Sequence, residues 1–328
     1  MRSTILAAII ILNLTLCEHP DPVSEGSEYA IKEIWGEYGT EPGQFDRPLG
    51  LAVRRVPDPL WLSYFIADYG NGRVQVLPFT GPPPNGAVMI GQTPVDTSQA
   101  IQPVSVTVTQ SIDDSLTPPE NMRVYVTDAR LHRICVFDLE GTFVRSWGGY
   151  GSDPGQFAAP KGIDMDFEGN IYVCDSGNHR VQVFDTVGNL VGIWGGYGTA
   201  PGLLRGPVDV EVAFDGTGRN FLYVAVTDQG NDRIQLFGRD GSLISAINGV
   251  ARPAGLTIWE DEILVVSSSS NRVLAFDVSN PRSPQQMGST DLPGATGVYD
   301  IFGKWGSNFD VTDSGGSRFV KYDYTASW

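Results

Sequence analysis

Three acidic side chains have the type and the spacing to bind a cation. Asp164, Asp209 and Glu211 each stand two or four residues after a proline that opens a β-rich run. Because side chains alternate along a strand, positions two and four share one face, so the three carboxylates should converge. Oxygen ligands of this kind suit Ca²⁺, which makes a calcium site the functional interpretation. The alternative is an acidic wall whose carboxylates pair with Lys161 or with backbone donors.

Tyrosine and histidine side chains form a second candidate group. Tyr38, Tyr150 and Tyr197 occupy equal places in three Trp-Gly-x-Tyr-Gly segments, and His132 and His179 occupy equal places in another repeated turn. Rings with an apolar body and a polar tip suit carbohydrate and peptide ligands, so we predict binding roles for all five. The alternative is packing for the tyrosines and a solvated turn position for the histidines.

A third candidate, Trp61, lies in an insertion. Three proline-containing insertions span Arg54 to Ser63, Thr80 to Ala100 and Gln110 to Asn121. Long connections without regular structure are often functional. We predict that Trp61 contacts a partner, with burial against its own sheet as the alternative.

The elements that must position these residues are short β-strands in a repeat. Each copy has a β-rich run, an Asp, four turn residues, an Arg and a second β-rich run. The copies pair Asp68 with Arg73, Asp128 with Arg133, Asp175 with Arg180, Asp228 with Arg233 and Asp313 with Arg318, and a sixth ends at Arg272 with Ser267 in place of the Asp. A function rarely needs six copies, so we predict a structural role in which the Asp accepts backbone N–H groups and the Arg pairs with it.

The fullest copy, residues 147–185, carries the motifs that identify the repeat. It contains Gly-Gln-Phe at 155–157, then Pro160 and Gly162, and then the Asp-x4-Arg turn at 175–180 followed by Val181. These motifs resemble the NHL repeat, and the resemblance covers residues 28–328. It implies an all-β fold, a six-bladed β-propeller of four-stranded antiparallel blades, and a role as an interaction platform.

The two ends of the repeat region complement each other. Residues 29–35 match the outer strand of a unit, whereas residues 319–322 match a third strand, so the last unit lacks a strand that the beginning supplies. Because an open ring leaves sheet edges exposed, we predict that the N-terminal strand completes the last blade.

His132 also resembles a zinc-ligand position in the peptidylglycine-amidating lyase branch of six-bladed propellers. That branch places its other zinc histidines just after the prolines of the inner strands. Those places hold Leu49, Val104, Lys161, Val208 and Ala254. A three-histidine zinc site therefore cannot be assembled in that way.

The residues before the repeats indicate export. Residues 1–17 contain an apolar run that is too short to span a bilayer and is typical of a signal peptide. The run ends at Cys17, which resembles a bacterial lipobox cysteine and is the predicted lipidation site. Residues 18–27 form a polar tether. We predict either a cell-envelope lipoprotein or a secreted protein, with buried thiols at Cys135 and Cys174.

Charge and motifs narrow the function further. With 22 basic and 38 acidic residues, the formal charge of −16 excludes a nucleic-acid binder that works by neutralising phosphates. We predict an exported binding or scaffold module for a protein, peptide or glycan partner, with membrane contact only through a lipid on Cys17. No cofactor is implied other than Ca²⁺. The alternative is a metal-dependent lyase or hydrolase at the mouth of the central channel.

Overall fold

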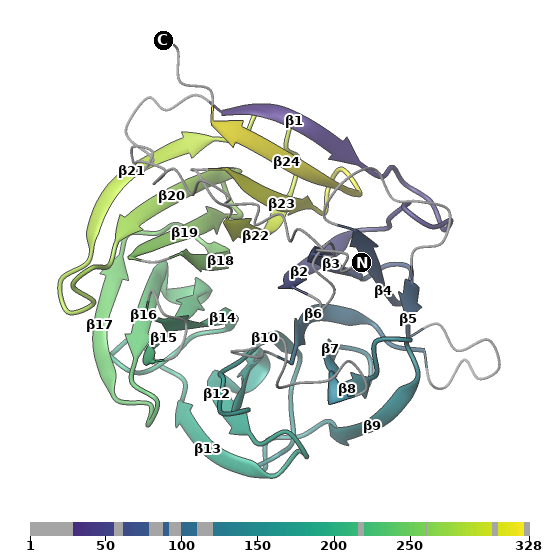
Figure 1. Cartoon of the computed structure of the whole chain (residues 1–328). Coiled ribbons are helices and arrows are strands. Elements are labelled where there is room, and N and C mark those ends of the chain that lie inside the picture. Colours follow the sequence, from purple (N-terminus) through teal and green to yellow (C-terminus); the bar gives the residue numbers. More distant parts are fainter. Residues whose placement is uncertain are drawn as a thin grey trace, which may run out of the picture.

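The strands of the chain form a closed ring of six four-stranded antiparallel sheets (Figure 1). The computed structural model describes residues 29–55, 62–78, 88–91, 100–109, 121–215, 220–259, 261–303 and 308–324. In each sheet one edge strand lines the centre of the ring and the other edge strand lies at its rim. The predicted six-bladed β-propeller is therefore confirmed.

The first five blades each use four consecutive strands. Blade 1 has β2 (Pro48–Arg55), β3 (Leu62–Asp68), β4 (Arg73–Pro78) and β5 (Val88–Ile90). Blade 2 has β6 (Pro103–Val108), β7 (Val124–Asp128), β8 (Arg133–Phe137) and β9 (Phe143–Gly148). Blade 3 has β10 (Pro160–Met165), β11 (Ile171–Asp175), β12 (Arg180–Phe184) and β13 (Leu190–Gly195). Blade 4 has β14 (Pro207–Phe214), β15 (Phe221–Asp228), β16 (Arg233–Phe237) and β17 (Leu243–Asn248). Blade 5 has β18 (Pro253–Trp259), β19 (Glu262–Ser267), β20 (Arg272–Asp277) and β21 (Gln285–Asp291).

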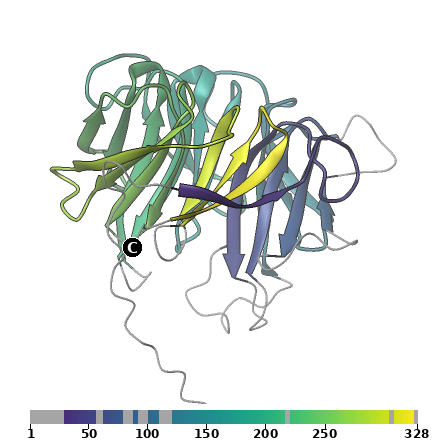
Figure 2. The same cartoon turned by 90° about the horizontal axis from the view of Figure 1, so that it is seen from above.

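Blade 6 is completed by the beginning of the chain. Its strands are β22 (Val298–Gly303), β23 (Phe309–Asp313), β24 (Arg318–Tyr324) and, outermost, β1 (Tyr29–Trp35). Figure 2 shows β1 running beside the last strands of the chain. Lys321 of β24 fixes the junction, because its Nζ lies 3.3 Å from Glu33 and 3.4 Å from the centre of the Trp35 ring. The predicted closure by the N-terminal strand is confirmed.

Apolar side chains from neighbouring blades interlock to form the core. The β-branched runs of the two middle strands are buried on both faces, as in Val124–Asp128 and Ile171–Asp175. The buried clusters bridge two blades at a time; one joins Phe65 and Val74 of blade 1 to Val126 of blade 2. Such packing covers both faces of each sheet, which a lone four-stranded sheet cannot do.

The repeated Asp and Arg residues hold the loops that lead into the blades. In blade 1 the Nε of Arg73 donates to Asp68 at 2.8 Å, and its other nitrogens donate to the carbonyl oxygens of Thr40, Glu41 and Gln44. The other oxygen of Asp68 accepts the amide of Asp46 at 2.8 Å. The predicted structural role of the Asp-x4-Arg pairs is confirmed, and it consists of fastening the preceding loop to the turn.

The remaining predictions concern the cysteines, the N-terminal segment and the insertions. Cys135 and Cys174 are buried free thiols, as predicted. Cys17, Trp61, the predicted signal peptide and tether, and the segments 56–61, 79–87, 92–99 and 110–120 lie outside the described residues. Within the described part of the chain, no helix has the length and apolarity needed to cross a membrane.

Candidate functional site: an aromatic face and an acidic channel

The three predicted tyrosines lie in the loops that link one blade to the next. Tyr38, Tyr150 and Tyr197 expose 73%, 77% and 68% of their surface. Each loop is rigid, because the tyrosine forms a bridge with a buried residue seven positions later, Phe157 in the case of Tyr150. The amide of Phe157 also donates to the carbonyl of Gly149 at 2.9 Å. The tyrosine rings are thus presented to solvent from a fixed backbone.

Each predicted histidine contacts one of these tyrosines in a tilted ring pair. The ring centre of His132 lies 5.0 Å from that of Tyr150, and the ring centre of His179 lies 4.9 Å from that of Tyr197. The interplanar angles are 51° and 53°. The structure therefore brings four of the five predicted ring residues together as two equal pairs on successive blade junctions.

The histidines also take part in the contact between blades. The Nδ1 of His132 accepts the amide of Ala159 at 3.1 Å, and the Nδ1 of His179 accepts the amide of Gly206 at 3.0 Å. A neutral ring that accepts at Nδ1 carries its proton on Nε2, so Nε2–H is its remaining donor. Histidine at this position therefore fixes its tautomer and its orientation beside the tyrosine.

Other junctions use different side chains for the same bond. Asp232 accepts the amide of Arg252 at 2.8 Å, and Ser317 accepts the amide of Arg47 at 3.3 Å. The acceptor at this turn position is thus structural in several blades. What distinguishes blades 2 and 3 is that the acceptor also stacks on an exposed tyrosine.

The three predicted channel carboxylates lie on inner strands around the centre of the ring (Figure 1). Asp164 of β10 accepts the amide of Val212 at 2.9 Å and the hydroxyl of Thr107 at 3.2 Å. Asp209 of β14 accepts the amide of Leu256 at 2.9 Å.

Glu211, also on β14, accepts the amide of Ile258 at 3.2 Å. In all three cases the amide belongs to the inner strand of the next blade. The carboxylates therefore join neighbouring blades through backbone donors, as the alternative interpretation had it, and Lys161 forms no ion pair with them among the described side chains.

A fourth channel carboxylate, Asp300, was missed in the sequence. It accepts the amides of Leu51 at 2.8 Å and of Ile301 at 2.9 Å. Its strand opens with Val298 where five other inner strands open with proline, so the proline did not mark it. The signal available was its place two residues into the strand, the same as that of Asp209.

The channel carboxyl groups hold their protons more tightly than ordinary ones. Burial raises the pKa of Asp164 to about 6 and that of Asp300 to about 7. Burial, and then the charges of the neighbouring carboxylates, raises the pKa of Asp209 and Glu211 well above the usual range. Asp164 and Asp209 keep part of their surface accessible.

The channel geometry does not favour the predicted calcium site. Among the described residues, no group of three or more His, Cys, Asp and Glu side chains could hold a metal ion. At least one oxygen of each predicted ligand already accepts a backbone amide. Calcium therefore stays a prediction from the sequence.

The comparisons with known proteins agree with the repeat. Residues 157–184 match the NHL repeat family. A stretch of 40 residues is 48% identical to the RING finger protein nhl-1 of Caenorhabditis elegans; it is 12% of this chain and 4% of that protein. The match is thus a single repeat of a much longer relative.

The similar solved structures support the fold and nothing beyond it. A streptogramin B lyase has a TM-score of 0.59 at 13% identity, over 92% of this chain and 88% of that one. An aldose sugar dehydrogenase of Streptomyces coelicolor, solved with bound PQQ, has a TM-score of 0.57 at 13% identity, over 93% of this chain and all of that one. The chain is a β-propeller that carries an NHL repeat, a fold common among binding and scaffold modules.

Proposed function

We propose that the protein is a binding module and that the face carrying Tyr38, Tyr150 and Tyr197 recognises a protein, peptide or glycan partner. The observation that carries the proposal is the pair of equal His–Tyr stacks, each with a tyrosine at least 68% exposed. Tyrosine is enriched at interfaces because its ring supplies apolar contact area and its hydroxyl a hydrogen bond.

Preorganisation is what makes these rings suited to binding. Each tyrosine is held by its loop, and two are also held by a histidine whose Nδ1 is fixed by a backbone amide. A ligand that stacks on such a ring loses little of its affinity to ordering the protein. The phenol hydroxyls and the histidine Nε2–H groups supply polar contacts that suit sugar hydroxyls and peptide amides.

The experiment uses the intact protein as bait in a pull-down from the envelope of its source, together with a glycan array. The wild type is compared with the double variant Tyr150→Ala, Tyr197→Ala, and with Val187→Ala as a control for loss of an exposed apolar residue in a turn of blade 3. We expect partners that the wild type and Val187→Ala retain and the double variant loses. Equal retention by all three proteins contradicts the proposal.

We also propose that the protein is exported and that Cys17 anchors it to the envelope. The support is the apolar run ahead of Cys17 in the sequence. A Cys17→Ser variant should move from the membrane fraction to the soluble fraction of the source cell. A wild-type protein found only in the soluble exported fraction indicates a secreted protein, and one that stays in the cytoplasm refutes export.

A second candidate is a metal-dependent lyase or hydrolase at the channel mouth. The observation that favours it is the set of four carboxyl groups on the inner strands, those of Asp164, Asp209, Glu211 and Asp300, whose raised pKa values favour proton transfer. Metal analysis of protein purified without chelator, followed by an activity screen with and without EDTA, tests it. A stoichiometric metal that is needed for turnover supports this candidate, and its absence together with an inactive protein removes it.

A further inference from the structure

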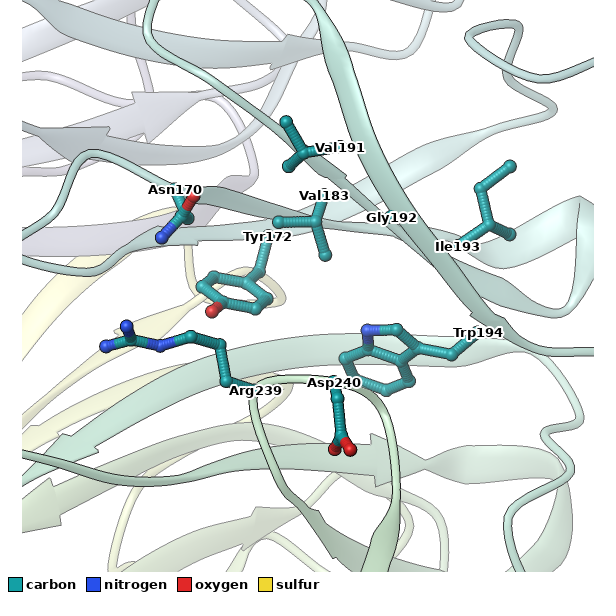
Figure 3. Close-up of a pocket in the computed structure, with 9 residues that line it drawn as sticks. All are labelled: Asn170, Tyr172, Val183, Val191, Gly192, Ile193, Trp194, Arg239 and Asp240. Atoms are coloured by element: carbon teal, nitrogen blue, oxygen red, sulfur yellow. The ribbon is translucent and has the colours of Figure 1, made fainter.

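A pocket of about 260 Å³ lies between blades 3 and 4, away from the aromatic face. Its apolar lining includes Tyr172, Val183 and Trp194, and Arg239 stands at its rim (Figure 3). The turns beside it join β10 to β11 and β16 to β17. These turns lie at the opposite strand ends from the Asp-x4-Arg turns and the tyrosine loops, so the pocket is separate from the site proposed above.

The pocket lies beside Gly192 of β13, at a position where the outer strands of the two neighbouring blades have side chains and that of blade 5 has Gly288. Gly192 pairs with Val183, as Arg145 pairs with Val136 in blade 2 and Ser245 with Leu236 in blade 4.

Those two side chains reach the next blade. Arg145 donates to the carbonyl of Thr186, and Ser245 donates to the carbonyl of Pro281 at 2.5 Å. At position 192 a Cβ would meet only Val183, at 3.7 Å, so a side chain fits there without a clash. The missing side chain leaves space that Arg145 and Ser245 occupy in blades 2 and 4.

The pocket runs along an unprotected strand edge. Among the described strands, β13 is the outermost of its blade and pairs with β12 alone. Residues Leu190–Gly195 include no charged residue and no proline, and Val191 and Ile193 are 58% and 41% exposed. Exposed sheet edges are usually blunted by charge or proline, and an extended peptide can add to one that is not.

Pairing on this edge aims a side chain into the pocket. Paired residues of neighbouring strands project to the same side of a sheet. A peptide residue opposite Gly192 therefore projects towards Val183 and Trp194, which lie on that side. The buried Nε1 of Trp194 has no hydrogen-bond partner in the described residues, and Figure 3 shows it turned towards Val183.

The surroundings of the pocket are acidic. Arg239 is held by Glu168, with Nη1 and Oε1 2.5 Å apart, and it lies over the Phe221 ring at 4.6 Å. The pocket lining contains Asp240 and Arg239, and the carboxylates of Asp166 and Glu168 lie beside Arg239. The excess of carboxylates favours basic residues on either side of the bound segment.

We propose that this pocket and the edge of β13 bind an extended peptide segment of a partner protein. One apolar side chain of the segment enters the pocket beside Gly192, its backbone pairs with β13, and basic residues flank the apolar one.

The probe is a phage-displayed library of random peptides, panned on the intact protein. Synthetic copies of enriched peptides are measured by fluorescence polarisation against the wild type, Gly192→Arg and Val187→Arg. The first variant copies Arg145 and fills the pocket, and the second adds the same charge in the neighbouring turn. If Gly192→Arg lowers the melting temperature, Gly192→Ser, which copies Ser245, replaces it as the variant that obstructs the pocket.

We expect enriched peptides with an apolar residue between basic ones. They should lose little affinity on Val187→Arg, where only the added charge acts, lose affinity at least about tenfold on Gly192→Arg, and weaken as NaCl rises. Binding should be unchanged in the Tyr150→Ala, Tyr197→Ala variant, which separates this site from the aromatic face. Peptides that bind Gly192→Arg as well as the wild type, or a selection that yields no peptide the two proteins distinguish, overturn the proposal.

Discussion

Replacing Asp164 by asparagine should stabilise the protein, and more so as the pH rises. The amide of an Asp164→Asn variant has the shape of the carboxyl group. Its oxygen can accept a backbone amide, as the carboxylate accepts those of Val212 and Met165, and its nitrogen can donate to the hydroxyl of Thr107. The substitution therefore removes the ionisation of Asp164 and little else.

The size of the effect follows from the pKa. Burial raises the pKa of Asp164 from 3.8 to about 6, and a difference of about 2 is worth about 3 kcal/mol. Because the folded-state pKa is raised, the proton-linked stability is fully present below about pH 4 and lost as the pH rises through about 6. Asp164 is partly accessible, so screening should reduce the gain of the variant to about 1–2 kcal/mol at pH 8.

The assay is urea unfolding followed by tryptophan fluorescence at about pH 4, 6 and 8. The difference in unfolding free energy between the variant and the wild type should be near zero at pH 4 and grow above pH 6. Asp185→Asn is the control of opposite sign, because hydrogen bonds led by Asn189 lower the pKa of Asp185. Its destabilisation should be present at neutral pH and fade as the pH falls. A gain for Asp164→Asn that does not change with pH refutes the reasoning.

Three further predictions concern stability. Arg73→Ala leaves the buried Asp68 without its cation and should lower the free energy of unfolding in urea by about 3–5 kcal/mol. Arg272→Ala, whose partner Asp291 is exposed, should lower it by less than about 1 kcal/mol. Equal losses would contradict the role of the buried pair. Deletion of residues 1–35 should lower the melting temperature, because it removes β1 from blade 6, and an unchanged value rules out the closure. Calcium should leave the melting temperature unchanged with and without EDTA, and a saturable rise would reinstate the predicted site.

The architecture was predictable because its determinants are local in the sequence. Five inner strands begin at the prolines that marked them, and the closing strand has the bounds that its pattern indicated, Tyr29–Trp35. Exposure of the tyrosines follows from their place in glycine-rich loops, where a ring has no neighbouring strand to cover it.

The contacts across blades were not predictable, because they join positions that the repeat leaves far apart. The bond from Ala159 to His132 spans 27 residues, and the bond from Leu51 to Asp300 spans 249. The pocket beside Gly192 is harder still to foresee, because the space is recognised only when this glycine is compared with Arg145 and Ser245 at the same position in the neighbouring blades.

These observations point to a common rule for finding binding sites in such a ring. At each junction the repeat demands a polar acceptor for the next blade, which Asp164, Glu211 and His132 supply. A residue that only meets this demand is explained by stability. Two features have no such structural explanation. One is the exposed tyrosine that contacts the ring of His132, and the other is the space that Gly192 leaves beside an uncharged strand edge. Both features lie on blade 3 or at its junctions, and we therefore expect substitutions there to change binding while leaving the ring folded.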